Sequence, residues 1–242
     1  MTARRFKVKH FAGVILGALI SSAAMTRAAA AESFYVNPIR LYVTPQSTSV
    51  LLKVTNTSED TLRFHLQPFG WKQAKDGSTV LDPTSDLVLF PRLLSLPANE
   101  SRNVRIGVSA KARRSQAERS KKDKSGKGKE QTYRIMVQQL PKRNTPADAR
   151  QIQVLTRMSV PLFVTPEDTS ANLKLADANV KDGELNFTVK NSGNAHALLT
   201  RVGLKVWDAN QSELYARTLK PWYVLAKTAR PYSVPLPEAI CR

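Results

Sequence analysis

Residues 151–166 have the sequence QIQVLTRMSVPLFVTP, and this stretch decides the fold. One parity of its first eight residues holds Leu155, Arg157 and two glutamines, and the other holds Ile152, Val154, Thr156 and Met158. Alternation with a period of two is the pattern of a β-strand with two unlike faces. The run VPLFV is apolar throughout, and the turn-forming residues TPED follow it. We therefore predict a long strand that leads from one domain towards a second.

Short segments with a strand pattern lie before and after this stretch. The clearest of them, separated by turn residues, are 35–43, 49–55, 62–71, 101–108, 132–140, 185–191 and 202–207. Strands at this spacing, with no helical periodicity after residue 31, indicate an all-β sandwich fold. We predict one unit at residues 32–166 and a second at 167–242. Because a sandwich domain has about 100 residues, we expect the second unit to be short, either lacking a final strand or truncated.

Residues 1–31 have the three-part layout of a secretory signal peptide. Four basic residues without an acid come first, an apolar run follows at 11–25, and three alanines at 29–31 offer a cleavage site. The apolar run is short for a bilayer span, which needs about 20 residues. We therefore expect an exported protein without stable membrane insertion. Cys241 is the only cysteine, so no intrachain disulfide can form.

Positive charge is concentrated in one segment of a chain whose formal net charge is +18. Residues 111–129 hold nine basic and two acidic residues and no aromatic residue. Export, and the absence from this segment of aromatic residues on which nucleic-acid bases could stack, argue against a nucleic-acid partner. We predict a basic loop at 111–130 that is either solvated and mobile or in electrostatic contact with an acidic partner or membrane headgroups.

The sequence offers little for catalysis. After residue 31 its histidines, His65 and His196, are isolated, and no spacing of His, Cys and Asp indicates a metal site. No glycine-rich phosphate loop follows a strand. We therefore predict a protein that is not an enzyme and has no catalytic residues, metal or cofactor.

Four blocks of sequence point to a family. In chain order they are VNPIRLYV (36–43), DLVLFPRLLSLPANESRNVRIGV (86–108), QTYRIMVQQLP (131–141) and VPLFVTP (160–166). With them the chain resembles the periplasmic pilus-assembly chaperones of the chaperone–usher pathway, nearest the branch that serves non-classical fimbriae. The resemblance implies two immunoglobulin-like domains in an L arrangement. It also implies a periplasmic protein that caps incomplete pilus subunits and delivers them to an outer-membrane usher.

The resemblance gives the opening stretch a role. Family members lend the last strand of their first domain to a subunit that lacks a strand, which pairs backbone to backbone and inserts alternate side chains. By position the donated side chains are Ile152, Val154, Thr156 and Met158. Apolar residues of the preceding strand would enlarge the apolar surface beside them, namely Tyr133, Ile135 and Val137. From the residues alone, the same face could instead pack into its own domain's core.

The family also binds the subunit's C-terminal carboxylate with two cations. The first, an arginine of the first strand, matches Arg40, which without the resemblance is an ordinary outward strand residue. The second, a lysine, falls on Pro161, which carries no charge. Arg157 has the same parity but lies four residues earlier, roughly 13 Å along a strand, and Arg134 is another candidate.

A different function is also compatible with the sequence. A secreted immunoglobulin-like adhesin or binding module could use the basic segment to hold an acidic polymer. Such a protein would bind by itself, with a steep dependence on salt.

Overall fold

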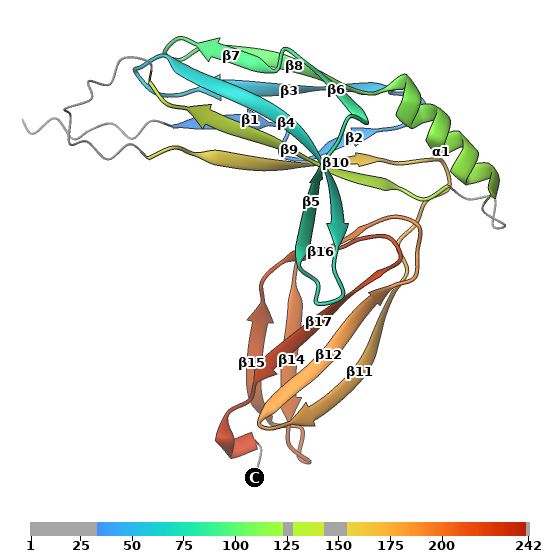
Figure 1. Ribbon diagram of the computed structural model, residues 1–242. Coiled ribbons are helices and arrows are strands. Elements are labelled where there is room, and N and C mark those ends of the chain that lie inside the picture. The colour runs from blue at the N-terminus through green and yellow to red at the C-terminus, as the bar shows by residue number, and fades with distance from the viewer. Residues whose placement is uncertain (1–32, 123–127, 143–153, 241–242) are drawn as a thin grey trace, which may run out of the picture. The chain divides into compact units, whose positions relative to one another are not determined.

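The computed structural model describes residues 33–122, 128–142 and 154–240, and its regular secondary structure is nearly all β-strand (Figure 1). The predicted all-β fold is confirmed. The predicted signal peptide and Ile152 lie outside the described residues.

Two sheets form the first sandwich. One has the strand order β1-β3-β8-β6 and consists of β1 (Phe34–Asn37), β3 (Ser49–Asn56), β8 (Ser101–Val108) and β6 (Leu87–Phe90). The other has the order β2-β10-β9-β4-β5, with β7 paired to β4. Its strands are β2 (Leu41–Val43), β10 (Arg157–Val164), β9 (Gln131–Leu140), β4 (Leu62–Gln73), β5 (Thr79–Pro83) and β7 (Leu93–Leu96). The first edge strand thus changes sheets between β1 and β2.

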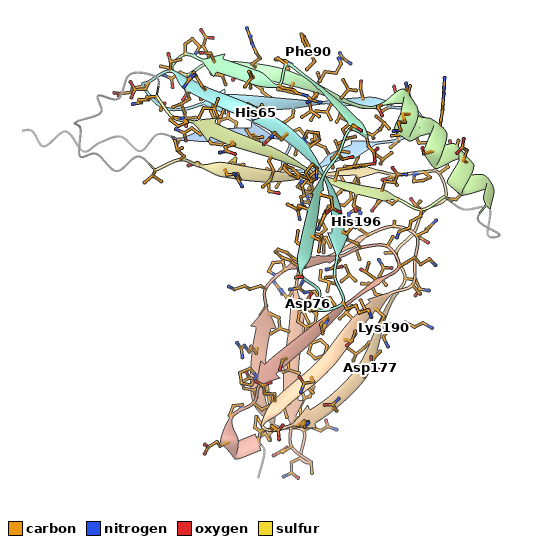
Figure 2. The ribbon with its side chains drawn as sticks, in the orientation of Figure 1. His65, Asp76, Phe90, Asp177, Lys190 and His196 are labelled. Carbon is orange, nitrogen blue, oxygen red and sulfur yellow. The ribbon has the colours of Figure 1, made fainter. Side chains whose placement is uncertain are left out.

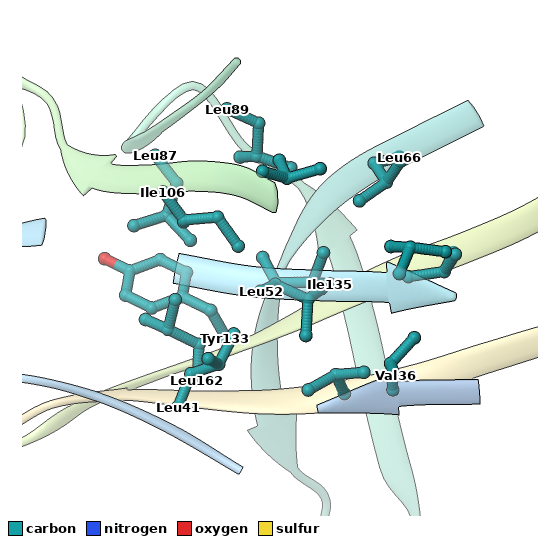
Figure 3. Packing of buried hydrophobic residues seen from close by; sticks show 14 of the residues in the cluster. Val36, Leu41, Leu52, Leu66, Leu87, Leu89, Ile106, Tyr133, Ile135 and Leu162 are labelled. Atoms are coloured by element: carbon teal, nitrogen blue, oxygen red, sulfur yellow. The ribbon is translucent and has the colours of Figure 1, made fainter. Parts of the chain in front are cut away.

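Alternating side chains of the two sheets meet in one core (Figure 3). From the first sheet they include Leu52 and Ile106, and from the second Ile135 and Leu162, all of them fully buried. This arrangement follows from the period of two, because each strand turns one parity towards the facing sheet. The predicted surface residues of β9 belong to this core: Tyr133, Ile135 and Val137.

The predicted basic loop is wrong over most of its length, because residues Ala110–Lys122 form the helix α1. Its sequence is rich in alanine, arginine and lysine, which have high intrinsic helix propensities. Ser109 caps the helix, since its side-chain oxygen accepts a hydrogen bond from the N–H of Ala112 at 3.2 Å. Ala112 is buried against the core, and this contact holds α1 on the sandwich.

The second sandwich is built from smaller sheets. A three-stranded sheet has the order β11 (Leu173–Lys181), β12 (Glu184–Asn191) and β17 (Thr228–Pro235). Two ribbons pair β13 (Ala197–Leu199) with β16 (Trp222–Val224) and β14 (Val202–Trp207) with β15 (Glu213–Leu219). A short 3-10 helix, η1 (Glu238–Ile240), follows β17. The buried hydrophobic residues described here are fewer than in the first sandwich, namely Phe187, Val224, Leu225, Ala226 and Val234.

Each sandwich contains a buried asparagine at the end of a central strand. Asn56 ends β3, and its amide donates to the carbonyl oxygens of Asp60, Leu96 and Pro97 at 2.7, 3.0 and 2.9 Å. Asn191 ends β12, and its amide donates to the carbonyl oxygens of Ala195 and Val224 at 2.8 and 3.1 Å.

Both asparagines also accept a hydrogen bond from the N–H two residues later, Ser58 in one case and Gly193 in the other. The two sandwiches therefore use the same device, a buried amide that satisfies backbone groups of the loops around it.

Candidate functional site

Strand β10 has one edge that is partly open. It pairs antiparallel with β9 along its whole length, from Arg157 opposite Gln138 to Val164 opposite Gln131. On its other side, β2 pairs only with residues Leu162 to Val164. Between Arg157 and Pro161 no described strand covers this side. An edge of this kind is a template for the addition of a further strand.

The side chains predicted to be donated lie on or just before β10. Val154 is 77% exposed and Thr156 is exposed, and the carbonyl oxygen of Thr156 accepts a hydrogen bond from the N–H of Gln139 at 3.0 Å. Met158 is half-buried and packs against the core. The same parity continues as Val160, Leu162 and Val164, which are core residues. This face is thus buried from Val160 to Val164 and exposed at Val154, before the strand begins.

Pro161 lies between two arginines. On one side its partner in the β9 ladder is Arg134. On the other side Leu162 pairs with Leu41, so continuing this parallel register by one residue places Arg40 beside Pro161. The position that lacks a charge therefore has Arg134 of β9 on one side and Arg40, the residue before β2, on the other.

Arg134 lies among aromatic rings. Its guanidinium carbon is 3.7 Å from the centre of the Trp71 ring and 5.6 Å from that of Tyr223, which is on β16 of the second sandwich. Burial lowers the pKa of Arg134 below its usual value. Burial also raises the pKa of Tyr223, while the positive charges of Arg40 and Arg134 oppose this increase.

Further aromatic contacts hold Tyr223 in place. Phe163 stacks on His196 with ring centres 3.6 Å apart, and Tyr223 meets the Trp71 ring edge-on at 5.2 Å. His196 is fixed by a 2.8 Å contact between its Nδ1 and an oxygen of the buried Glu130 carboxylate. These contacts, like those of Gln73 with the backbone of residues 223 and 225, join the two sandwiches.

The remaining predicted anchor, Arg157, is at the start of β10. Its guanidinium is exposed and donates a 2.9 Å hydrogen bond to the side-chain oxygen of Gln138. Arg40 is also exposed. No sequence pattern singles out Trp71 or Tyr223, because their approach to Arg134 depends on sheet register and on contacts between the sandwiches.

The described parts of the chain contain no group of three or more His, Cys, Asp and Glu side chains arranged for a metal ion. His65 and His196 belong to different sandwiches (Figure 2). A helix long and apolar enough to span a bilayer is also absent from these parts.

A family model connects this architecture to known proteins. The model for the pili and flagellar-assembly chaperone family, PapD N-terminal domain, matches residues 33–170, more than half of the chain. The chain belongs to this family. No sequence among curated proteins matches this chaperone.

Solved structures share its fold. A chain of the CsuC–CsuE chaperone–tip adhesion subunit complex, from archaic Csu pili of Acinetobacter baumannii, is 17% identical with a TM-score of 0.55, covering 84% of this chaperone and 90% of that chain. A chain of the complex of Salmonella enterica SafA pilin with the SafB chaperone is 14% identical with a TM-score of 0.54. The match covers 84% of this chaperone and 85% of that chain. The Escherichia coli chaperone DraB is 16% identical with a TM-score of 0.52, and the match covers 85% of this chaperone and 87% of that chain. The fold is therefore that of pilus-assembly chaperones with two immunoglobulin-like β-domains.

Proposed function

We propose that the chain is a periplasmic chaperone that caps incomplete pilus subunits with strand β10 and delivers them to an outer-membrane usher. The observation that carries this proposal is the open edge of β10 between Arg157 and Pro161. Backbone N–H and C=O groups on that edge can pair with a strand of another protein. Family membership supplies the class of partner, a pilus subunit.

The faces of β10 fit this task. A subunit that lacks a strand exposes an apolar groove and unpaired backbone, both of which favour aggregation. A strand placed in that groove satisfies the backbone and fills the groove with alternate side chains. Val154 is 77% exposed in the free chain, and burying a valine contributes about 1.5–3 kcal/mol. Ile152 and Thr156, on the same parity, would add to this.

Strand β9 supports the same interface from within the core. Tyr133, Ile135 and Val137 share the inward face of this sheet with Met158 and Val160. A subunit strand added beside β10 would continue the sheet, and its inward side chains would extend this apolar layer. These three residues would contribute through the packing of this buried layer, because their side chains are not exposed.

Solved complexes of related fold support the class of partner. The CsuC–CsuE structure holds a chaperone with a tip adhesion subunit, and the SafA–SafB structure holds a pilin with a chaperone.

Co-expression tests the proposal. A pilus subunit encoded beside this chain is expressed in the periplasm with and without it. We expect the subunit to stay soluble and to co-purify only when the chain is present, and to leave the complex when the purified usher is added. An equal yield of soluble subunit without the chain would refute the proposal.

Arg40 gives a prediction for the anchoring of the subunit. We propose that its guanidinium binds the subunit's C-terminal carboxylate, because the planar fork can donate to both oxygens. A hydrogen bond to a charged group contributes about 1.5–3 kcal/mol, so Arg40→Ala should weaken subunit binding roughly tenfold to 100-fold in titration calorimetry. Arg105→Ala is the matched control, since it removes the same charge from an exposed position on the other sheet. Equal affinities of the two variants would contradict the role of Arg40.

A further inference from the structure

We propose that a cavity between helix α1 and the end of the first sandwich binds an acyl chain with a carboxylate head, in the form of a free medium-chain fatty acid. The cavity lies apart from the proposed subunit interface. Strand β10 contributes only Val164 to it, at the end of the strand that β2 covers. The inference therefore does not depend on the proposed function.

The cavity has the size and the lining of a small-molecule site. Its volume is about 370 Å³, and sites for small ligands measure about 300–1,000 Å³. Its floor is the end of the hydrophobic core, formed by Val43, Val108 and Val164. The walls come from the loop after β2, from the residues after β10 and from α1, which lies across this end of the sandwich (Figure 1).

Backbone hydrogen bonds hold the loop walls of the cavity in place. Thr44 and Ser47 exchange two hydrogen bonds of 3.1 Å, which close the turn after β2. The N–H of Thr165 donates to the carbonyl oxygen of Val43 at 2.9 Å and joins this turn to the end of β10. A cavity that is already formed loses little conformational entropy when it takes up a ligand, and this favours binding.

Arg113 supplies the only charge in the lining of the cavity. It is four residues from Ala117, so the two share one face of α1, and both line the cavity. Arg113 is exposed and has no carboxylate partner among the residues that the structure describes. The lining contains no acidic residue. An apolar floor with one cation at its edge matches an apolar chain that ends in a negative charge.

The positive charge of α1 by itself would fit a different partner, an anionic membrane surface. Lys111 and Arg114 are also exposed, and they do not line the cavity. Charge alone would attract phospholipid headgroups whatever the shape of the cavity. A fatty acid needs the cavity itself, so substitutions that fill the cavity separate the two partners.

Titration calorimetry of the full chain with octanoate, decanoate and decanol tests the assignment. Each buried CH₂ group raises the affinity about fourfold, so decanoate should bind about 15-fold more tightly than octanoate. Decanoate should bind roughly threefold to fivefold more tightly than decanol, because a charge pair at an exposed cation is weak. Arg113→Ala should remove this preference for the acid. Arg114→Ala is the matched control and should keep it, since Arg114 is the neighbouring exposed arginine outside the lining.

A second pair of substitutions tests the cavity. Ala117→Trp should weaken decanoate binding by about 15-fold or more, the effect of displacing two CH₂ groups. Glu118→Trp adds the same ring at the next exposed position and should leave decanoate binding unchanged. Both variants should keep the thermal unfolding midpoint of the unsubstituted chain, because both positions are exposed.

Three results would overturn the inference. The first is an equal affinity for octanoate and decanoate, and the second is decanoate binding that survives Ala117→Trp. The third is binding to phosphatidylglycerol vesicles without binding of decanoate, which would assign α1 to a membrane surface.

Discussion

A chain that carries both Ile152→Asp and Val154→Asp is expected to lose at least about 99% of its affinity for a pilus subunit. Two buried aliphatic side chains contribute about 3–6 kcal/mol together, and each 1.4 kcal/mol is a factor of ten. The substitutions also place two carboxylates in an apolar groove, where desolvation of an unpaired charge is costly. Co-purification of the subunit, followed by titration of the purified proteins, measures the effect.

The free chaperone should tolerate these changes. Val154 is 77% exposed and precedes the first residue of β10, so a charge there removes no core contact. We expect the thermal unfolding midpoint of the double variant to equal that of the unsubstituted chain. Leu155→Asp is the matched control, since it adds one charge on the opposite parity, at a side chain that is 38% exposed. Capture that survives the double substitution, or that Leu155→Asp abolishes equally, would show that this face is not donated.

The strand period allowed much of the first sandwich to be predicted from the sequence. In β10 the side chain of Met158 packs against the core, and the alternate residues Val160 and Leu162 belong to the core, as a period of two requires. Alternation alone could not show where the unpaired edge of the strand begins. That boundary depends on how far β2 extends along the edge, and β2 pairs with residues 162–164 only. The open edge is therefore a property of the sheet and not of the strand.

Helix α1 shows a different limit of sequence analysis. Its residues have little apolar periodicity, so a search for alternating faces gives no signal. Helix propensity and the Ser109 cap favour the helix, and one buried residue, Ala112, fixes it on the sandwich. Charge density alone was misleading, because arginine and lysine are good helix formers as well as common loop residues.

The proposed carboxylate anchor could be predicted in part. Arg40 was singled out by the family resemblance of residues 36–43, and in the structure it lies between β1 and β2. The position of Arg134 beside Pro161 depends on the register between β9 and β10, and the ring of Tyr223 comes from a strand about 90 residues later in the chain. Side chains brought together by sheet register and by contacts between two sandwiches leave no local pattern in the sequence.

Replacement of Asn56 by alanine should give the largest loss of stability expected from one substitution at a polar residue here. Asn56 is fully buried, and its amide serves the carbonyl oxygens of Asp60, Leu96 and Pro97. Each buried group left without a partner costs about 1–3 kcal/mol. With three carbonyl oxygens affected, some of them reached by water, we expect the free energy of unfolding to fall by roughly 3–5 kcal/mol in urea titrations.

Two further substitutions show whether this effect comes from the buried amide. Asn103→Ala removes an exposed asparagine from β8 of the same sandwich and should change the free energy of unfolding by less than about 0.5 kcal/mol. Asn191→Ala should destabilise the second sandwich by roughly 2–4 kcal/mol, because its amide serves two carbonyl oxygens where that of Asn56 serves three. A change as small in Asn56→Ala as in Asn103→Ala would mean that water replaces the amide, and that the loop between β3 and β4 does not need it.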